Sequence, residues 1–182
     1  MSFSLDVKRE VYTIINNRHC AIAELSAIVD YCSDIGYNPL FISISSENKF
    51  MVYKFKNLVK FIFDVDVVID TDSGKSYKIF ICDELLINNI FNIINKNVYE
   101  EELYSSLVVN SICCKRAYIR GAFLGIGYIC SPVKNYHLEF MCNTYSQAKN
   151  LKNLINFLKI YNYLNINFIE LYYSNYKTLY KY

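Results

Sequence analysis

The chain has 182 residues, of which 53% are hydrophobic and 20% charged. This composition is sufficient for a buried core, and the length suits one domain or two small ones. No apolar run reaches the roughly 18 residues that a membrane-spanning helix needs. The N-terminus, MSFSLDVKREVY, lacks the apolar segment of a secretion signal. A net charge of +2 argues against strong polyanion binding by the whole surface. We therefore expect a cytoplasmic globular protein without membrane contact.

The first half of the chain has the apolar spacing of helix, helix, strand, helix, hairpin and helix. The corresponding ranges are 5–15, 20–32, 40–45, 47–63, 65–82 and 85–94. Ser2, with Asp6 in the first turn, suits the start of the first helix. The second helix is expected to bury one apolar face, formed by Ile22, Leu25, Val29 and Cys32. A polar, acidic linker is expected over about 96–104.

The same order begins again after the linker, with a helix from Cys113, a strand over 136–142, a helix over 146–161 and a strand over 166–172. The segment KNLVKFIF, which starts at Lys56, reappears as KNLINFLK 96 residues later. We therefore predict a tandem repeat in one domain, with the first copy over about 18–95 and the second over 105–182. The second copy is expected to be incomplete, because it lacks a final strand and helix.

Small residues recur at every fourth position in the two matching helices. At an offset of 94 residues, Ala23 corresponds to Ala117, and Ala27 corresponds to Gly121. Helices with such positions can cross with their backbones in close contact. The sequence therefore predicts that these helices form the central pair of a pseudo-twofold α/β (α+β) domain. The alternative is that two unrelated amphipathic stretches share a 3.6-residue period.

Three segments resemble a known family: MSFSLDVKRE, AELSAI and CCKRAYIRGAFLGIGYICSPVKNYHLEF. They look like the WhiA family of sporulation and cell-division regulators, which is similar in architecture to the LAGLIDADG homing endonucleases. The resemblance implies two paired central helices with an antiparallel saddle sheet. It also implies a transcription regulator that associates with DNA in the nucleoid. We expect this chain to lack the C-terminal helix-turn-helix domain that the family carries.

The resemblance also bears on catalysis. Each paired helix of the endonucleases ends in an acidic residue that holds a divalent metal at the scissile phosphate. Cys32 and Ile126 correspond to these positions, and neither offers the oxygen ligand that Mg²⁺ requires. We therefore expect no enzyme activity and no catalytic residues. Asp30 lies two residues before Cys32 and is expected to be a solvated polar residue.

Basic side chains are the candidates for DNA contact. These are Lys75 and Lys78 on the hairpin, and Lys115, Arg116 and Lys134 around the second paired helix. If the sheet grips DNA as in the endonucleases, the lysines would position phosphates without reading bases. An ordinary solubilising surface is the alternative. Arg120 lies on a helix face that should pack, so we expect it in a buried ion pair.

Cysteines and glycines suggest no cofactor. The seven cysteines are Cys20, Cys32, Cys82, Cys113, Cys114, Cys130 and Cys142. Their number is odd and none are spaced C-x-x-C, so reduced, buried thiols are expected instead of disulfides or a zinc knuckle. The spacing G-x-x-x-G-x-G from Gly121 misses the dinucleotide-binding fingerprint. We therefore expect neither a metal nor a cofactor.

Two further patterns each allow a functional and a structural interpretation. Four acids, Asp64, Asp66, Asp70 and Asp72, are spaced so that they would share one face of a strand. They suggest either a divalent-ion site or a solvated strand edge. His137 and Glu139 share the outward face of one strand, which suits acid/base chemistry or an exposed polar face. The structural interpretation is favoured in both cases.

Three functions therefore remain open. The first is a non-catalytic domain of a DNA-associated regulator, acting with or without a protein partner. The second is an active or degenerate homing endonuclease. The third is a protein-interaction module that never touches DNA. The oligomeric state is left open.

Overall fold

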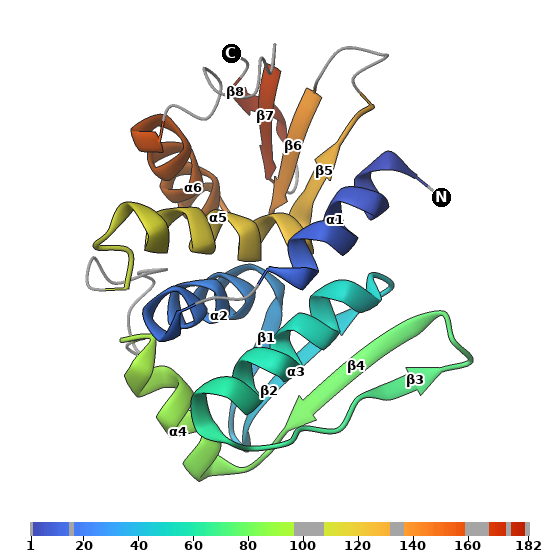
Figure 1. The fold of residues 1–182 in the computed structure, drawn as a ribbon, viewed down its shortest axis with the longest axis vertical. Coiled ribbons are helices and arrows are strands. Elements are labelled where there is room, and N and C mark those ends of the chain that lie inside the picture. The colour runs from blue at the N-terminus through green and yellow to red at the C-terminus, as the bar shows by residue number, and fades with distance from the viewer. Residues whose placement is uncertain are drawn as a thin grey trace.

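The structure is a computed structural model that describes the backbone of residues 2–14, 17–96, 108–131, 137–158, 168–173 and 176–180. Side chains are described in these ranges up to residue 158. Two four-stranded sheets lie on opposite sides of a pair of helices, α2 and α5, in the middle of the molecule (Figure 1). None of the described helices is long and apolar enough to cross a membrane.

The first unit contains α1 (Phe3–Thr13), α2 (Arg18–Cys32), β1 (Ser33–Tyr37), β2 (Leu40–Ser46), α3 (Lys49–Phe63), β3 (Asp70–Asp72), β4 (Ser76–Ile81) and α4 (Glu84–Ile93). Side-chain caps fix three of its helix starts. The Ser2 hydroxyl accepts the Leu5 N–H at 3.3 Å, as the sequence predicts for α1. Asn48 caps α3 and Asp83 caps α4 in the same way.

The second unit contains α5 (Ile112–Ile126), β5 (Gly127–Ile129), β6 (His137–Cys142), α6 (Tyr145–Leu158), β7 (Phe168–Tyr173) and β8 (Tyr176–Tyr180). Its sheet therefore has four strands, like the first, and the expectation that a final strand is missing is wrong. The described residues contain no second-unit counterpart of α4. Apart from Lys96, the predicted linker over 96–104 lies outside the described residues.

The two sheets differ in one pairing. The first has the order β1-β2-β4-β3 and is antiparallel throughout. In the second, with the order β5-β6-β7-β8, β6 and β7 pair in parallel. The expected antiparallel saddle is therefore wrong at this pair. In the second unit, the strand after α6 is β7, which pairs directly with β6 and must therefore run parallel to it after a crossover. In the first unit, the strand after α3 is β3, which lies at the edge of the sheet and does not pair with β2.

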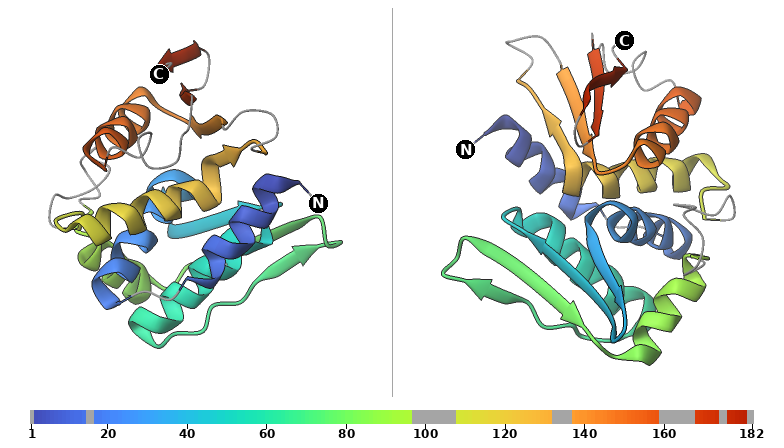
Figure 2. Two further views of the ribbon diagram at one scale, coloured as in Figure 1. Left: turned by 45° about the horizontal axis from the view of Figure 1, so that its top comes forward. Right: turned by 180° about the vertical axis from the view of Figure 1, so that it is seen from behind.

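Two hydrophobic cores meet at the paired helices, and α2 contributes to both. Its Leu25 and Ile28 pack into the core of the first unit, and its Ala23 and Ala27 into that of the second. The prediction that α2 buries a single apolar face is therefore wrong, because the helix is buried on two sides. Because α5 covers one side of α2 and the first sheet with α3 lies on the other, nearly all of the helix is buried (Figure 2).

The crossing of α2 and α5 depends on small residues. Ala23, Ala27 and Ala117 are fully buried. A Cβ atom added to Gly121 would lie 2.5 Å from the Glu24 carbonyl oxygen and 2.9 Å from the Ala27 Cβ. The two backbones are therefore in direct contact, as the small residues of both helices indicate.

Candidate functional site at the paired helices

The C-terminal ends of the paired helices lie together. Cys32 is the last residue of α2, and Ile126 is the last residue of α5. A Cβ atom added to Gly125 would collide with the Cys32 Sγ, so these ends are in contact. Burial raises the pKa of the Cys32 thiol to about 12. The last residue of each helix is therefore an uncharged side chain, and neither is an oxygen ligand.

Each of these helix ends is capped by the opposite unit. The Asn48 side-chain amide, at the start of α3, donates to the Leu124 carbonyl of α5 at 2.8 Å. The Gln147 amide of α6 donates to the Asp30 carbonyl of α2, also at 2.8 Å. Leu124 follows Asp30 by 94 residues, so the two caps occupy equivalent places. They satisfy carbonyls that a helix end leaves without a partner.

Asp30 is buried, which contradicts the expectation of a solvated residue. Its carboxylate accepts hydrogen bonds from Tyr118 at 2.8 Å, Lys96 at 2.8 Å and Ser26 at 3.3 Å. Burial raises the pKa of its carboxyl to about 6, although Lys96 opposes this shift. Asp30 is enclosed because α2 is in contact with other elements on nearly all of its sides. Its oxygens are engaged by the protein, so it is not a ready metal ligand.

A second buried charge cluster lies further toward the N-termini of the paired helices. The fully buried Glu24 carboxylate lies 3.5 Å from the Lys54 Nζ and 3.8 Å from the Arg120 Nε. Lys54 also donates to the carbonyls of Ile14 at 2.7 Å and Tyr12 at 3.3 Å. Burial lowers the pKa of Lys54. Arg120 is thus in an ion pair within the protein, as the sequence predicts.

The elements that carry the described candidate DNA-contacting cations, the β3–β4 hairpin and α5, lie apart in the molecule (Figure 1). Lys75, in the β3–β4 turn, and Lys78, on β4, are exposed. Arg116 is exposed on α5, whereas the Lys115 Nζ donates to the Val109 carbonyl at 2.5 Å. Lys134 lies outside the described residues. The four candidate cations that the structure describes are therefore not gathered into one patch.

The acidic row is not one strand face. Asp64 ends α3 in the left-handed conformation and pairs with Lys60 at 2.9 Å. Asp66 lies before β3 and pairs with Lys56 at 2.8 Å. Among the four acids, only Asp70 and Asp72 lie on β3, where both are exposed. The hairpin begins later than expected because Asp64 turns the chain, and in the described part of the chain these acids do not form a metal-ligating group.

The outward face of the second sheet also carries an acid. His137 and Glu139 point to the same side of β6, as expected, with 2.7 Å between the His137 Nε2 and the Glu139 Oε1. Tyr128 of β5 lies opposite Glu139. In the first sheet Asp70 lies opposite Lys78. Among the described side chains, the outer face of each sheet thus carries at least one acid, Asp70 in the first and Glu139 in the second.

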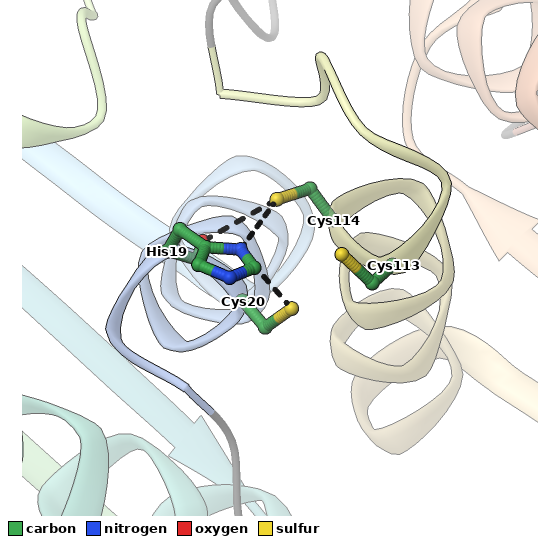
Figure 3. Close-up of side chains that lie close together, drawn as sticks. All are labelled: His19, Cys20, Cys113 and Cys114. Carbon is green, nitrogen blue, oxygen red and sulfur yellow. Dashed lines mark hydrogen bonds between the residues drawn. The ribbon is translucent and has the colours of Figure 1, made fainter.

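Tertiary structure brings together four residues that the sequence patterns did not single out as a group. His19 and Cys20 lie in the first turn of α2, and Cys113 and Cys114 in the first turn of α5 (Figure 3). Burial raises the pKa of Cys20 to about 12, whereas a hydrogen bond from Ser111 lowers that of Cys113. The offset of 94 residues, already seen for Ala23 and Ala117, is the signal that would have joined the two pairs.

Comparison with known proteins is consistent with this architecture. A family model described as the WhiA LAGLIDADG-like domain matches residues 115–178. The chain is 30% identical over 171 residues to the probable cell division protein WhiA of Lachnoclostridium phytofermentans, and 36% identical over 171 residues to that of Clostridium botulinum (strain Hall). Each alignment covers 86% of this chain, but 55% and 54% of these relatives. The chain thus spans about half the length of the curated relatives it matches.

Solved structures show the same fold. The crystal structure of the N-terminal LAGLIDADG domain of DUF199/WhiA matches 92% of this chain and 78% of its own, with a TM-score of 0.62 and 20% identity. Full-length DUF199/WhiA from Thermatoga maritima gives the same TM-score and identity over 52% of its length. The chain is therefore similar to the WhiA proteins over most of its length, and it has the fold of the LAGLIDADG-like domain seen in these structures.

Proposed function

We propose that this chain is a non-catalytic, DNA-associated regulatory domain that acts in the control of cell division or sporulation. The observation that carries the proposal is the pair of residues at the helix ends, Cys32 and Ile126, where the endonuclease architecture needs acids. The relatives are named as probable cell division proteins, which supports the regulatory role. Their extra length leaves room for a separate DNA-reading module.

The absence of hard metal ligands at the helix ends supports a non-catalytic role. A divalent ion at a scissile phosphate needs carboxylate oxygens at the junction of the two helices. A thiol and an aliphatic side chain end the helices, and the nearby Asp30 is hydrogen bonded to Tyr118, Lys96 and Ser26. A plasmid-nicking assay with Mg²⁺ or Mn²⁺ should give no cut DNA, and metal-dependent cleavage by the purified chain would contradict the proposal.

DNA contact by this domain is expected to be weak and electrostatic. The exposed Lys75, Lys78 and Arg116 lie on separate elements and would each contact a phosphate. Gel shifts at decreasing salt should reveal binding that weakens as salt rises. Lys75→Glu combined with Lys78→Glu should reduce it, whereas Lys149→Glu, a charge reversal at an exposed position of α6, is the matched control.

A protein-interaction domain is the second candidate, and the outer sheet faces favour it. Among the described side chains, Asp70 lies opposite Lys78 and Glu139 lies beside His137, so an acid on each face repels phosphate. An apolar cavity of about 440 Å³ between α1, α5, α6 and the second sheet offers room for an apolar side chain of a partner. Absence of any salt-sensitive DNA binding at low ionic strength would favour this candidate.

A further inference from the structure

We infer that His19, Cys20, Cys113 and Cys114 form a tetrahedral zinc site that ties the N-terminal ends of the paired helices together. The inference does not depend on whether this domain contacts DNA. Each of the four residues offers one ligand atom, and all four atoms lie within 4.8 Å of one another (Figure 3). In the described part of the chain, they form the one such group of three or more histidine, cysteine or acidic residues.

The distances suit a common metal ion. The His19 Nδ1 lies 3.2 Å from the Cys114 Sγ and 3.4 Å from the Cys20 Sγ. In a tetrahedral site, zinc–sulfur bonds of ~2.3 Å and zinc–nitrogen bonds of ~2.0 Å place neighbouring ligand atoms roughly 3.5 to 3.8 Å apart. The side chains therefore need only small adjustments to surround an ion. Three sulfurs and one imidazole favour zinc over Mg²⁺ or Ca²⁺, which prefer oxygen.

The site follows the internal symmetry of the fold. Cys113 and Cys114 follow His19 and Cys20 by 94 residues, which is also the offset between Ala23 and Ala117 at the helix crossing. Each helix thus contributes two adjacent residues of its first turn. Because the crossing brings the two first turns together, the four ligands converge without a C-x-x-C spacing in either helix.

Electrostatics at the helix ends also favour the bound form. A zinc ion with three thiolates and one neutral imidazole carries one net negative charge. The N-terminal end of a helix attracts negative charge, and two such ends meet here. Lys115 and Arg116 follow the ligands in α5 and add positive charge nearby. The Ser111 hydroxyl lies 3.0 Å from the Cys113 Sγ and can orient it.

Ordinary core packing does not account for this group. Cys20 and Cys114 are buried and would pack as apolar thiols, but His19 and Cys113 are exposed and still point toward them. The place is also distinct from the endonuclease metal position. Each helix is 15 residues long, so its N-terminal end lies roughly 20 Å from its C-terminal end at Cys32 or Ile126.

Metal titration of the 182-residue chain tests the inference. The protein is reduced with a phosphine, freed of metal with a chelator and titrated first with Co²⁺ and then with Zn²⁺. We expect one Co²⁺ per chain, with the visible bands of tetrahedral cobalt and near-ultraviolet sulfur-to-cobalt charge transfer. One Zn²⁺ should displace it and raise the melting temperature, because zinc binds the folded chain.

Variants separate the site from nonspecific thiol binding. Cys113→Ser and His19→Ala change exposed residues, so both chains should fold. Each removes a ligand and should weaken Co²⁺ and Zn²⁺ binding by more than the ~10-fold that loss of a partner behind a ligand costs. Cys82→Ser removes an exposed cysteine after β4 and should bind as the unchanged chain does. The inference fails if reduced protein shows no charge-transfer band, or if Cys113→Ser retains full binding and the zinc-dependent rise in melting temperature.

Discussion

The buried carboxyl of Asp30 makes stability depend on pH. Burial raises its pKa from 3.8 to about 6 in the folded chain. Between these values the folded chain keeps a proton that the unfolded chain has lost, so the free energy of unfolding falls as pH rises from about 4 to 6. A shift of this size corresponds to roughly 3 kcal/mol.

Asp30→Asn removes the titrating group, and urea unfolding at several pH values checks the effect. The free energy of unfolding of the original chain should fall relative to the variant between about pH 4 and 6. Lys96, which lies 2.8 Å from the Asp30 carboxylate, limits the size of this fall. Parallel pH profiles for the two chains would show that Asp30 titrates normally.

Gly121 tests the close contact of the helix backbones. Replacing a helical glycine by alanine stabilises a helix by up to about 1 kcal/mol, but the new Cβ would meet the Glu24 carbonyl oxygen. We expect Gly121→Ala to lower the free energy of unfolding by ~1 to 3 kcal/mol, because a backbone atom must move. Urea unfolding measures the change.

The matched control is Gly125→Ala in a Cys32→Ala background. There the alanine Cβ no longer meets the Cys32 Sγ, which the background removes. Relative to Cys32→Ala alone, this substitution should be neutral or stabilising. Equal effects of the two glycine substitutions would mean that the helices do not cross as closely as the structure shows.

At the level of elements, Glu24 holds three helices together. It lies on α2, its partner Lys54 on α3 and Arg120 on α5, and Lys54 also bonds the end of α1. Glu24→Gln removes the charge that faces the buried Lys54 and the partly exposed Arg120. We expect a loss of about 3 to 5 kcal/mol in the free energy of unfolding, measured in urea.

Two further substitutions serve as controls for the effect of Glu24→Gln. Lys54→Met in the Glu24→Gln background should recover part of the loss, because it removes the buried ammonium that the glutamine no longer balances. Asp66→Asn breaks the exposed pair with Lys56 and should leave stability unchanged. If Glu24→Gln were as harmless as Asp66→Asn, the buried cluster would not support the helix junction.

At the level of the whole molecule, the two cores share α2 and α5 and should unfold together. Phe55 lies in the first core and Phe140 in the second, and both are fully buried. Either substitution by alanine should cost about 3 to 5 kcal/mol. Amide hydrogen exchange should then accelerate in β2 and β6 alike. Faster exchange confined to the unit that carries the substitution would show that the units unfold separately.

The sequence by itself was sufficient for the helices and for their internal repeat. Apolar periodicity located the six described helices to within two or three residues at most of their ends. The spacing of Ala23, Ala117 and Gly121 identified the surfaces that touch. Apolar periodicity did not predict β1 and β5, because their residues follow directly from the ends of α2 and α5 and show little apolar alternation. These predictions succeeded where the relevant interactions are local or repeat at a fixed offset.

Only the tertiary structure decided which polar residues are enclosed and which distant residues meet. The sequence alone predicts Asp30 to be a surface acid, whereas in the structure α5 and Lys96 cover it. The parallel pairing of β6 with β7 depends on the path of the chain between them. The convergence of His19 and Cys20 with Cys113 and Cys114 likewise depends on the helix crossing. Periodicity records which face of a helix is apolar, but contacts between residues 94 positions apart are set by how closely the two backbones pack.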